Sequence, residues 1–418
     1  MTTNTTTSKP FSANAGFNAN SESGSSAGTS EGGSAGTSEG GSAGTSEGGS
    51  SSTAPGVTGS TQLPLAGITV LDLTRLLPGP VATMHLADMG ASIIKIEDRG
   101  AGDYARSMMH VRHALSQMFI AVNRNKNIVH LDLKQPDDHQ AFLSMVDTAD
   151  VVIESFRPGV MNRLGLGWDV LKARKPSLVM CAISGYGQSG PLSQQAGHDL
   201  NYIGYAGMLS QTADDTGRPV ISNLQVGDLL GGALSAVQGV LAALLAVKMG
   251  GPGRFVDVSM TDAVFAHHLM PLFAFNHAGQ AAAPARDFLT GGLPCYNVYR
   301  CSDDRYMAVG ALELKFWERV CDVIERPDLK QQHWAHGQGV GSTEAMAVRD
   351  QLATLFATRT QAEWHALFEP ADCCVTPVLT PEEALHHPNF VARGMVRSEA
   401  HPTEGTYLGT GPSVKFYD

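Results

Sequence analysis

Cysteine is scarce in this chain of 418 residues, which carries only six. Four are scattered and two, Cys373 and Cys374, are adjacent, so none shows the C-x-x-C spacing of a metal or redox motif. Few thiols in such a pattern indicate a protein of the reducing cytosol. The N-terminus also lacks a basic stretch followed by an apolar run, and no secretory signal is predicted. We therefore expect a cytoplasmic protein without a metal site.

Basic residues are also few, since 29 Lys and Arg stand against 40 Asp and Glu, a formal net charge of −11. Contacts to a phosphate backbone need a basic surface, and the acidic balance speaks against nucleic acid as a partner. A single phosphorylated ligand is still compatible, because a few local Arg and Lys suffice to hold one phosphate group.

Glycine-rich phosphate loops are absent. No G-x-G-x-x-G follows the first predicted strand, and no G-x-x-x-x-G-K-[ST] occurs. No nucleotide cofactor is therefore predicted from the motifs. Long apolar runs are limited to Leu229–Met249, which has the length of a membrane span but includes Ser235, Gln238 and several glycines. Without a second such run, we interpret it as a buried central helix and expect no membrane partner.

The first 62 residues contain almost nothing apolar. The block SAGTSEGG occurs three times in tandem, at 26–33, 34–41 and 42–49. Such a segment cannot offset its ordering entropy by burial, and each unit lacks the apolar residues that a folded repeat needs. We predict that residues 1–62 form a disordered tail, which is either a natural extension or an engineered linker.

The rest of the chain alternates strands and helices, and 43% hydrophobic residues suffice for a core. Strands are predicted at Leu65–Thr74, Ser92–Glu97, Asn127–Lys134, Val151–Phe156, Leu178–Gly187 and Phe255–Met260. Helices between them, such as Pro136–Thr148, predict a large α/β domain at 63–260 with an open parallel sheet. Functional loops are then expected at the carboxyl ends of the strands.

A second pattern follows. Tyr296–Leu312 resembles a hairpin, and helices are predicted at Leu314–Glu325, Thr343–Ala357 and Gln361–Leu367 before a strand at Cys374–Leu379. We predict a smaller α/β domain at 290–380, with 380–418 completing the large domain.

Three places in the sequence have an acidic residue or a histidine next to the end of a predicted strand or the start of a predicted helix. His198 and Asp199 follow the fifth strand, where an active site is expected. The alternative is that His198 is an ordinary loop histidine and Asp199 a helix N-cap. Asp228 precedes the apolar helix, where it is either an N-cap or a carboxylate aimed into a cleft. Gly231 and Gly232 would then allow a close approach of backbone or ligand. Glu313 starts a helix and is, by itself, no more than a first-turn carboxylate.

Many segments, in this order and spacing, resemble the family III CoA-transferase superfamily (CaiB/BaiF type), and within it the α-methylacyl-CoA racemases. The matching text includes LAGITVLDLTRLLPGPVATMHLADMGA, IIKIEDRGAGDYAR, LDLK, ADVVIESFRPGVMNRLGLG, SGYGQSGP, AGHDLNY, NLQVGDLLGG, GRFVDVSM, YRCSDDRYMAVGALE and DCCVTPVLTPEEALHHP. The resemblance covers about 63–400. It implies a large Rossmann-like domain plus a smaller α/β domain, the family III fold of interlocked homodimers.

The resemblance also implies roles for single residues. His198, in a G-H-D-[IL]-N-Y segment, and Asp228, 30 residues later, would flank the substrate α-carbon, and Glu313 would support His198, supplied by the partner subunit. Free N–H groups at the start of the apolar helix would hold the enolate oxygen. The positions matched to binding the coenzyme A substrate are Arg99, Arg124, Leu131, Asp132, Leu133, Lys134, Ser155, Phe156, Arg157, Arg163, Gly197, Leu200, Asn201 and Tyr202.

Two reactions fit the family. A racemase would invert the α-carbon of a 2-methylacyl-CoA with two bases on opposite faces, without a cofactor. A CoA-transferase would instead form a mixed anhydride on Asp199, but would leave His198, Asp228 and Glu313 without a joint role. The histidine favours the racemase. An idle acyl-CoA-binding protein is a third, less motivated class. FLTGGLP (Phe288–Pro294) departs from the racemase M-L-D-G-G-A-P text and leaves the acyl chain open.

Overall fold

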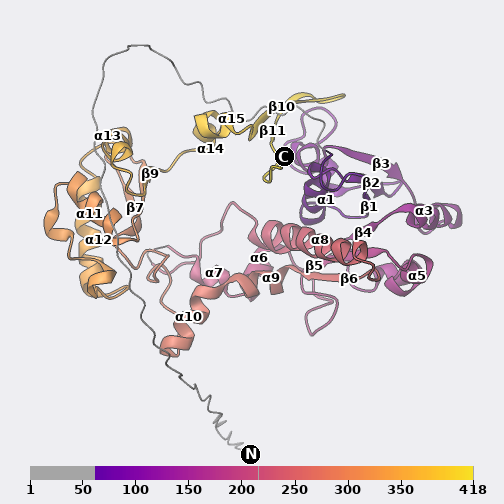
Figure 1. The fold of residues 1–418 in the computed structure, drawn as a ribbon, viewed down its shortest axis with the longest axis horizontal. Helices are drawn as coiled ribbons and strands as arrows, with labels where there is room; N and C mark the ends of the chain where they lie inside the picture. The colour runs from indigo at the N-terminus through magenta and orange to yellow at the C-terminus, as the bar shows by residue number, and fades with distance from the viewer. Residues whose placement is uncertain (1–61, 215, 418) are drawn as a thin grey trace, which may run out of the picture. The chain divides into compact units, whose positions relative to one another are not determined.

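The computed structural model describes residues 62–417 except Asp215, so the predicted tail lies outside the described residues apart from Gln62. The main element is a six-stranded sheet in the order β3-β2-β1-β4-β5-β6 (Figure 1). All neighbouring strands are parallel. The strands are β1 (Thr69–Asp72), β2 (Ser92–Glu97), β3 (Lys126–His130), β4 (Val151–Glu154), β5 (Val179–Ser184) and β6 (Phe255–Ser259). This order confirms the predicted open, Rossmann-like sheet.

Successive strand residues point to opposite faces, and both faces of this sheet are buried. Val70 belongs to the core on one face and Leu71 to the core on the other. The first core contains residues of α1 (Pro78–Asp88) and α8 (Ser235–Lys248), and the second contains residues of α3 (Pro136–Thr148) and α5 (Trp168–Arg174). The strand order reverses between β1 and β4, whose carboxyl ends are therefore neighbours at the place where such sheets bind ligands.

The predicted apolar helix is continuous, but its hydrogen-bonding pattern changes along its length. It starts as the π-helical segment η2 (Gly227–Leu234) and continues as α8. Gly231 and Gly232 are required by packing, because a Cβ at either would come within 2.8 Å of Met260 O or Pro78 Cβ. Gly227–Lys248 is the one helix in the described residues that length and composition would allow to cross a membrane, and 44% of its most apolar window is buried. Core helices pass the same test.

Shorter elements connect the sheet. They are η1 (Tyr104–Ser107), α2 (Gln117–Val122), α4 (Val160–Arg163), α6 (Asp199–Tyr205), α7 (Met208–Gln211), α9 (Met260–His267) and α10 (Leu269–Ala278). Several predicted strands were too long, most clearly Leu65–Thr74, of which β1 covers only Thr69–Asp72, and Asn127–Lys134, where β3 stops at His130 and a turn follows at Asp132–Gln135. The Asp132 carboxylate accepts the Lys134 N–H at 3.1 Å, a local hydrogen bond that competes with the sheet.

The later part of the chain forms a three-stranded antiparallel sheet in the order β7-β8-β9 with its own core. Its elements are β7 (Tyr296–Arg300), β8 (Tyr306–Gly310), α11 (Leu314–Val323), η3 (Pro327–Leu329), η4 (Trp334–His336), α12 (Thr343–Phe356), α13 (Gln361–Phe368), η5 (Glu369–Ala371) and β9 (Val375–Pro377). The hairpin, the three helices and the returning strand were all predicted from the sequence. The domain limits 63–260 and 290–380 stay a prediction.

The C-terminal segment contains a hairpin that the sequence pattern did not reveal. After α14 (Pro381–His386) and α15 (Pro388–Ala392), β10 (Val396–His401) pairs with β11 (Gly405–Thr410). The buried carboxylate of Glu404, between these strands, accepts the N–H groups of His113, Ala114 and Leu115 at 2.9–3.1 Å. These bonds tie the C-terminal hairpin to the segment that follows η1.

Candidate active site

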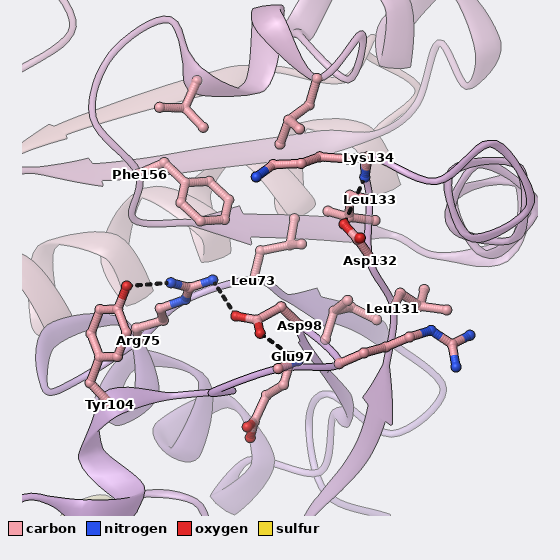
Figure 2. A pocket seen from close by; sticks show the side chains of 15 residues that line it. Leu73, Arg75, Glu97, Asp98, Tyr104, Leu131, Asp132, Leu133, Lys134 and Phe156 are labelled. Carbon is pink, nitrogen blue, oxygen red and sulfur yellow. Dashed lines mark hydrogen bonds and ion pairs between the residues drawn. The ribbon is translucent and has the colours of Figure 1, made fainter.

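Two cavities open at the carboxyl ends of the central strands and share part of their walls. The first has a volume of about 550 Å³ and is lined by the segment after β1, by β2 and the residues after it, by the turn after β3 and by the segment after β4 (Figure 2). The second has a volume of about 740 Å³ and is lined by the segments after β1, β4 and β5 and by η2. Arg75, Tyr104 and Phe156 line both cavities. The two cavities are therefore the halves of one trough.

The first cavity combines apolar walls with charged groups at its edge. Leu73, Leu131 and Leu133 form part of the wall, and Lys134 points across the cavity toward Phe156 (Figure 2). Within residues 62–214 and 216–417, no acidic side chain forms an ion pair with Lys134. Arg99 also lines this cavity, although its guanidinium already forms a bidentate pair with Asp138 at 2.7 Å. Such a cavity suits a flat, partly apolar ligand that carries a phosphate.

Arg75 stands where the two cavities meet and was missed by the sequence analysis. Its guanidinium lies 5.2 Å from the ring centroid of Tyr104 and 5.7 Å from that of Phe156. It donates to the Tyr104 hydroxyl at 3.2 Å and to Asp98 at 3.1 Å (Figure 2). The available signal was its position, three residues after β1, at the strand end where α/β sheets bind ligands.

The second cavity contains His198 and Asp228 together. His198 is the N-cap of α6, and its N–H donates to Asn201 Oδ1 at 3.0 Å. Asp199 is thus the first residue of α6 and not its N-cap. Tyr202 donates its hydroxyl to Gly197 O, and burial raises the pKa of this phenol to about 12. The lining residues that the sequence predicted are Ser155, Phe156, Arg157, Gly197, His198, Asn201, Tyr202 and Asp228.

Asp228 lies in the first turn of η2 and is half-buried. Burial raises the pKa of this carboxyl to about 6, the nearby Asp199 carboxylate raises it too, and His198 opposes the shift. A carboxyl with such a pKa can both accept and donate a proton near neutral pH. Among the cavity groups, Asp228 is therefore prepared for acid–base chemistry.

The prediction that the start of this helix holds an enolate oxygen was wrong for its first donors. The N–H of Asp228 donates to Asp199 Oδ1 at 3.0 Å, and the N–H of Leu229 donates to Gln225 O at 2.9 Å. Both donors are occupied because η2 is preceded by a helical turn and capped by a side chain from α6. Asp199 itself is not among the residues that line the cavity.

Four further predicted residues lie outside both cavities. Arg124 pairs with Asp88 at 2.5 Å, and both side chains are more than 90% buried. Arg163 ends α4 as an exposed residue, and Leu200 is 41% exposed on α6. Glu313 is the exposed N-cap of α11. The structure therefore does not bring Glu313 into the cavity that contains His198.

A third cavity of about 490 Å³ is lined from the same helix turn that contains Asp228. Val226, Leu230 and Leu234 form its apolar wall, and α9 contributes Val264 and His267. Asp228 thus stands between residues that face an apolar cavity, while its own side chain lines the polar one.

Several known proteins are similar to this chain in sequence or structure. The α-methylacyl-CoA racemase of Homo sapiens is 34% identical over 326 residues, covering 78% of this chain and 80% of that protein. The succinyl-CoA:glutarate CoA-transferase of Homo sapiens is 30% identical over 349 residues, covering 83% and 79%. The crystal structure of Rv3272 from M. tuberculosis superimposes with a TM-score of 0.71 at 29% identity, covering 85% and 93%. The family model of CoA-transferase family III matches residues 65–418, and the chain belongs to this family of racemases and CoA-transferases.

Proposed function

We propose that this chain is a racemase that inverts the α-carbon of a 2-methylacyl-CoA thioester. The observation that carries the proposal is the shared cavity of His198 and Asp228, in which burial raises the pKa of Asp228 to about 6. Inversion needs one group that removes the α-proton on one face and another that donates a proton on the opposite face. The His198 imidazole and a carboxyl with a pKa of about 6 form a suitable pair.

The proton balance is simple in each direction. When His198 accepts the α-proton, the C–H electron pair moves into the thioester to form an enolate, and protonated Asp228 returns a proton to the other face. The pair is then left as imidazolium and carboxylate. The reverse reaction starts from that state, with the Asp228 carboxylate as base and His198 as acid. No cofactor is needed, because coenzyme A is part of the substrate.

The trough accommodates the rest of the substrate in this proposal. The first cavity would take the nucleotide end, with Lys134 and Arg99 near its phosphate, and Arg75 would hold the diphosphate at the junction. Arg157 lines the second cavity and would act next to the pantetheine arm. The third cavity, beside Asp228, would receive a branched acyl chain, because Val226, Leu230, Leu234 and Val264 make much of its wall apolar.

Glu313 enters the proposal only through a second subunit. It is exposed at a helix N-terminus and does not line the cavity of its own chain. We propose that an interlocked homodimer supplies this carboxylate to His198 of the partner chain. Light scattering that shows a monomer at high protein concentration would contradict this part.

CoA transfer through an anhydride on Asp199 is the second candidate, since one relative named above is a succinyl-CoA:glutarate CoA-transferase. One observation weighs against it. Asp199 Oδ1 accepts the Asp228 N–H at 3.0 Å, and Asp199 is not among the cavity-lining residues. Its nucleophilic oxygen would then be Oδ2, and the side chain would have to turn into a cavity that it does not line.

Incubation with a chiral 2-methylacyl-CoA separates the two reactions. We expect the enzyme to convert one epimer into the other without a free carboxylic acid, and a carboxylate acceptor should not increase turnover. Chiral chromatography of the hydrolysed product measures inversion, and mass spectrometry of new thioesters measures transfer. Transfer without inversion, together with trapping of Asp199 by hydroxylamine, would replace the racemase by the transferase.

The two substrate epimers should share one bell-shaped pH dependence. Inversion in either direction needs one proton on the His198–Asp228 pair, placed on Asp228 for one epimer and on His198 for the other. Because these two forms carry the same number of protons, the ratio of the two kcat/KM values should not change with pH. Both values should fall toward low pH, where Asp228, with a pKa of about 6, and His198 both carry a proton and no base remains. Initial rates of inversion of each epimer between pH 4 and 8, followed by chiral chromatography, measure this limb, and its absence would argue against Asp228 as one of the two groups.

A further inference from the structure

The turn that presents Arg75 has an unusual backbone. Leu76, the next residue, has φ = +65°, a left-handed conformation that a branched side chain adopts only when its surroundings enforce it. Two N–H groups of this turn are held by side chains that are distant in sequence. The Arg75 N–H donates to Ser155 Oγ at 3.3 Å, and the Leu76 N–H donates to Asp103 Oδ1 at 3.0 Å. The turn therefore depends on contacts that are distant in sequence.

A buried ion pair provides two of these contacts. Lys95 Nζ lies 3.0 Å from Asp103 Oδ2, and neither side chain is exposed. The same ammonium donates to Thr74 O at 2.8 Å, on the other side of Arg75 from the Leu76 contact. Lys95 thus holds the residue before Arg75, and Asp103 holds the residue after it.

The same pair also fixes the aromatic neighbours of Arg75. Asp103 Oδ1 accepts the Ala105 N–H at 3.0 Å and caps η1, which begins with Tyr104. The hydroxyl of Tyr104 in turn accepts a hydrogen bond from Arg75. Both ends of the Arg75–Tyr104 contact are therefore set by one buried carboxylate, which is itself neutralised by Lys95.

We propose that Lys95 and Asp103 are positioning residues that preset the Thr74–Leu76 turn and thereby place Arg75 at the junction of the two cavities for the diphosphate of coenzyme A. The inference rests on the proposed function in one respect, that the trough binds coenzyme A. The inference extends the proposed function in two ways. Arg75 binds the diphosphate, and the Lys95–Asp103 pair, which does not touch the ligand, sets the position of Arg75.

A cycle of variants tests the proposal with free coenzyme A as the probe in isothermal titration calorimetry. Arg75→Met should weaken binding at least tenfold, because one charge-assisted contact to a phosphate is lost. Lys95→Met combined with Asp103→Leu removes both buried charges and should weaken binding to a similar degree. All three substitutions together should be no more than about threefold worse than Arg75→Met alone, because the pair acts through Arg75. With acyl-CoA, KM should rise while kcat changes little.

Lys134→Met is the matched control, since Lys134 lines the first cavity without any contact to the pair. When Lys134→Met is combined with the Lys95/Asp103 variant, the two fold-losses of coenzyme A affinity should multiply. If this double substitution prevents folding, Lys95→Met combined with Asp103→Asn takes its place in the cycle, because it removes both charges and the Lys95 contact with Thr74 O but keeps an oxygen for the Leu76 N–H. Two results would overturn the inference and leave the proposed function intact. One is a triple variant whose loss of coenzyme A affinity equals the product of the losses in Arg75→Met and in the Lys95/Asp103 variant. The other is a wild-type affinity of Arg75→Met for coenzyme A. Absence of coenzyme A binding by the wild-type chain would instead remove the proposed function and this inference with it.

Discussion

The Asp228→Asn enzyme is expected to exchange the α-proton of one substrate epimer with deuterium and to invert neither epimer. His198 can still remove a proton from its own face and return a deuteron to the same face. The amide that replaces the carboxyl would not supply a proton to the opposite face, and racemisation should fall by about 10²- to 10⁴-fold. Exchange measured by mass spectrometry and inversion measured by chiral chromatography, on the same samples, separate the two events.

The same substitution should make the protein more stable at neutral and higher pH. The folded protein binds the Asp228 proton with a pKa of about 6, compared with 3.8 as the ordinary value, so wild-type stability falls as the pH rises through this window. Above pH 6, removal of the half-buried charge should contribute about 1–2 kcal/mol after allowance for solvent screening. Below the unfolded pKa the gain should vanish, because both states are then neutral. Urea unfolding at pH 3 and pH 8 measures the difference.

Asp262→Asn is the matched control for both effects. Asp262 also lies in the first turn of a helix, α9, but it is exposed and lines none of the three cavities described above. This variant should keep wild-type inversion and wild-type stability at both pH values. If Asp228→Asn inverts its substrate as fast as the control, the two-base proposal cannot stand.

The sheet could be predicted because it depends on short-range patterns, and the shared cavity of His198 and Asp228 could be predicted from the sheet topology that these patterns imply. Strand residues such as Val70 and Leu71 are apolar in a run, as expected for strands buried on both faces. His198 and Asp228 both follow strand or loop ends that a parallel sheet brings to one edge. Their place in one cavity follows from topology, and only the resemblance to a known family assigned them a joint role.

Other residues were misjudged because their partners are distant in sequence. Arg124 looked available for a phosphate, yet Asp88, 36 residues earlier, captures it in a buried pair. The donors at the start of η2 looked free, yet the Asp199 carboxylate reaches the first of them from another helix. Local patterns contain no information about which side chain will satisfy a given donor or cation. The same limit explains why Arg75, whose neighbours are Asp98, Tyr104 and Phe156, was overlooked.

Lys126→Met is expected to lower the free energy of unfolding by about 3–5 kcal/mol at pH 7, because it leaves a buried carboxylate without its cation. Lys126 Nζ lies 3.2 Å from Asp72 Oδ2, and neither side chain is exposed. Burial raises the pKa of Asp72, but the charges of Lys126 and Lys95 and the hydroxyls of Thr74 and Thr83 outweigh it and hold this pKa below its ordinary value. Burial lowers the pKa of Lys126 to about 8, so the ammonium is still charged at pH 7.

Two comparisons decide whether the lost charge is the cause. Asp72→Asn added to Lys126→Met should recover much of the loss, because the amide oxygen still accepts from one threonine hydroxyl, the amide NH2 can donate to the other, and no unpaired charge remains. Arg174→Met breaks an exposed pair with Asp147, also a close contact at 2.6 Å, and should cost less than about 1 kcal/mol. The loss in Lys126→Met should also shrink toward pH 5, where Asp72 can take up a proton. An equal loss at both pH values, with no recovery in the double variant, would assign the effect to the missing hydrogen bonds of Lys126 with Pro80 and Asn123 instead of to charge.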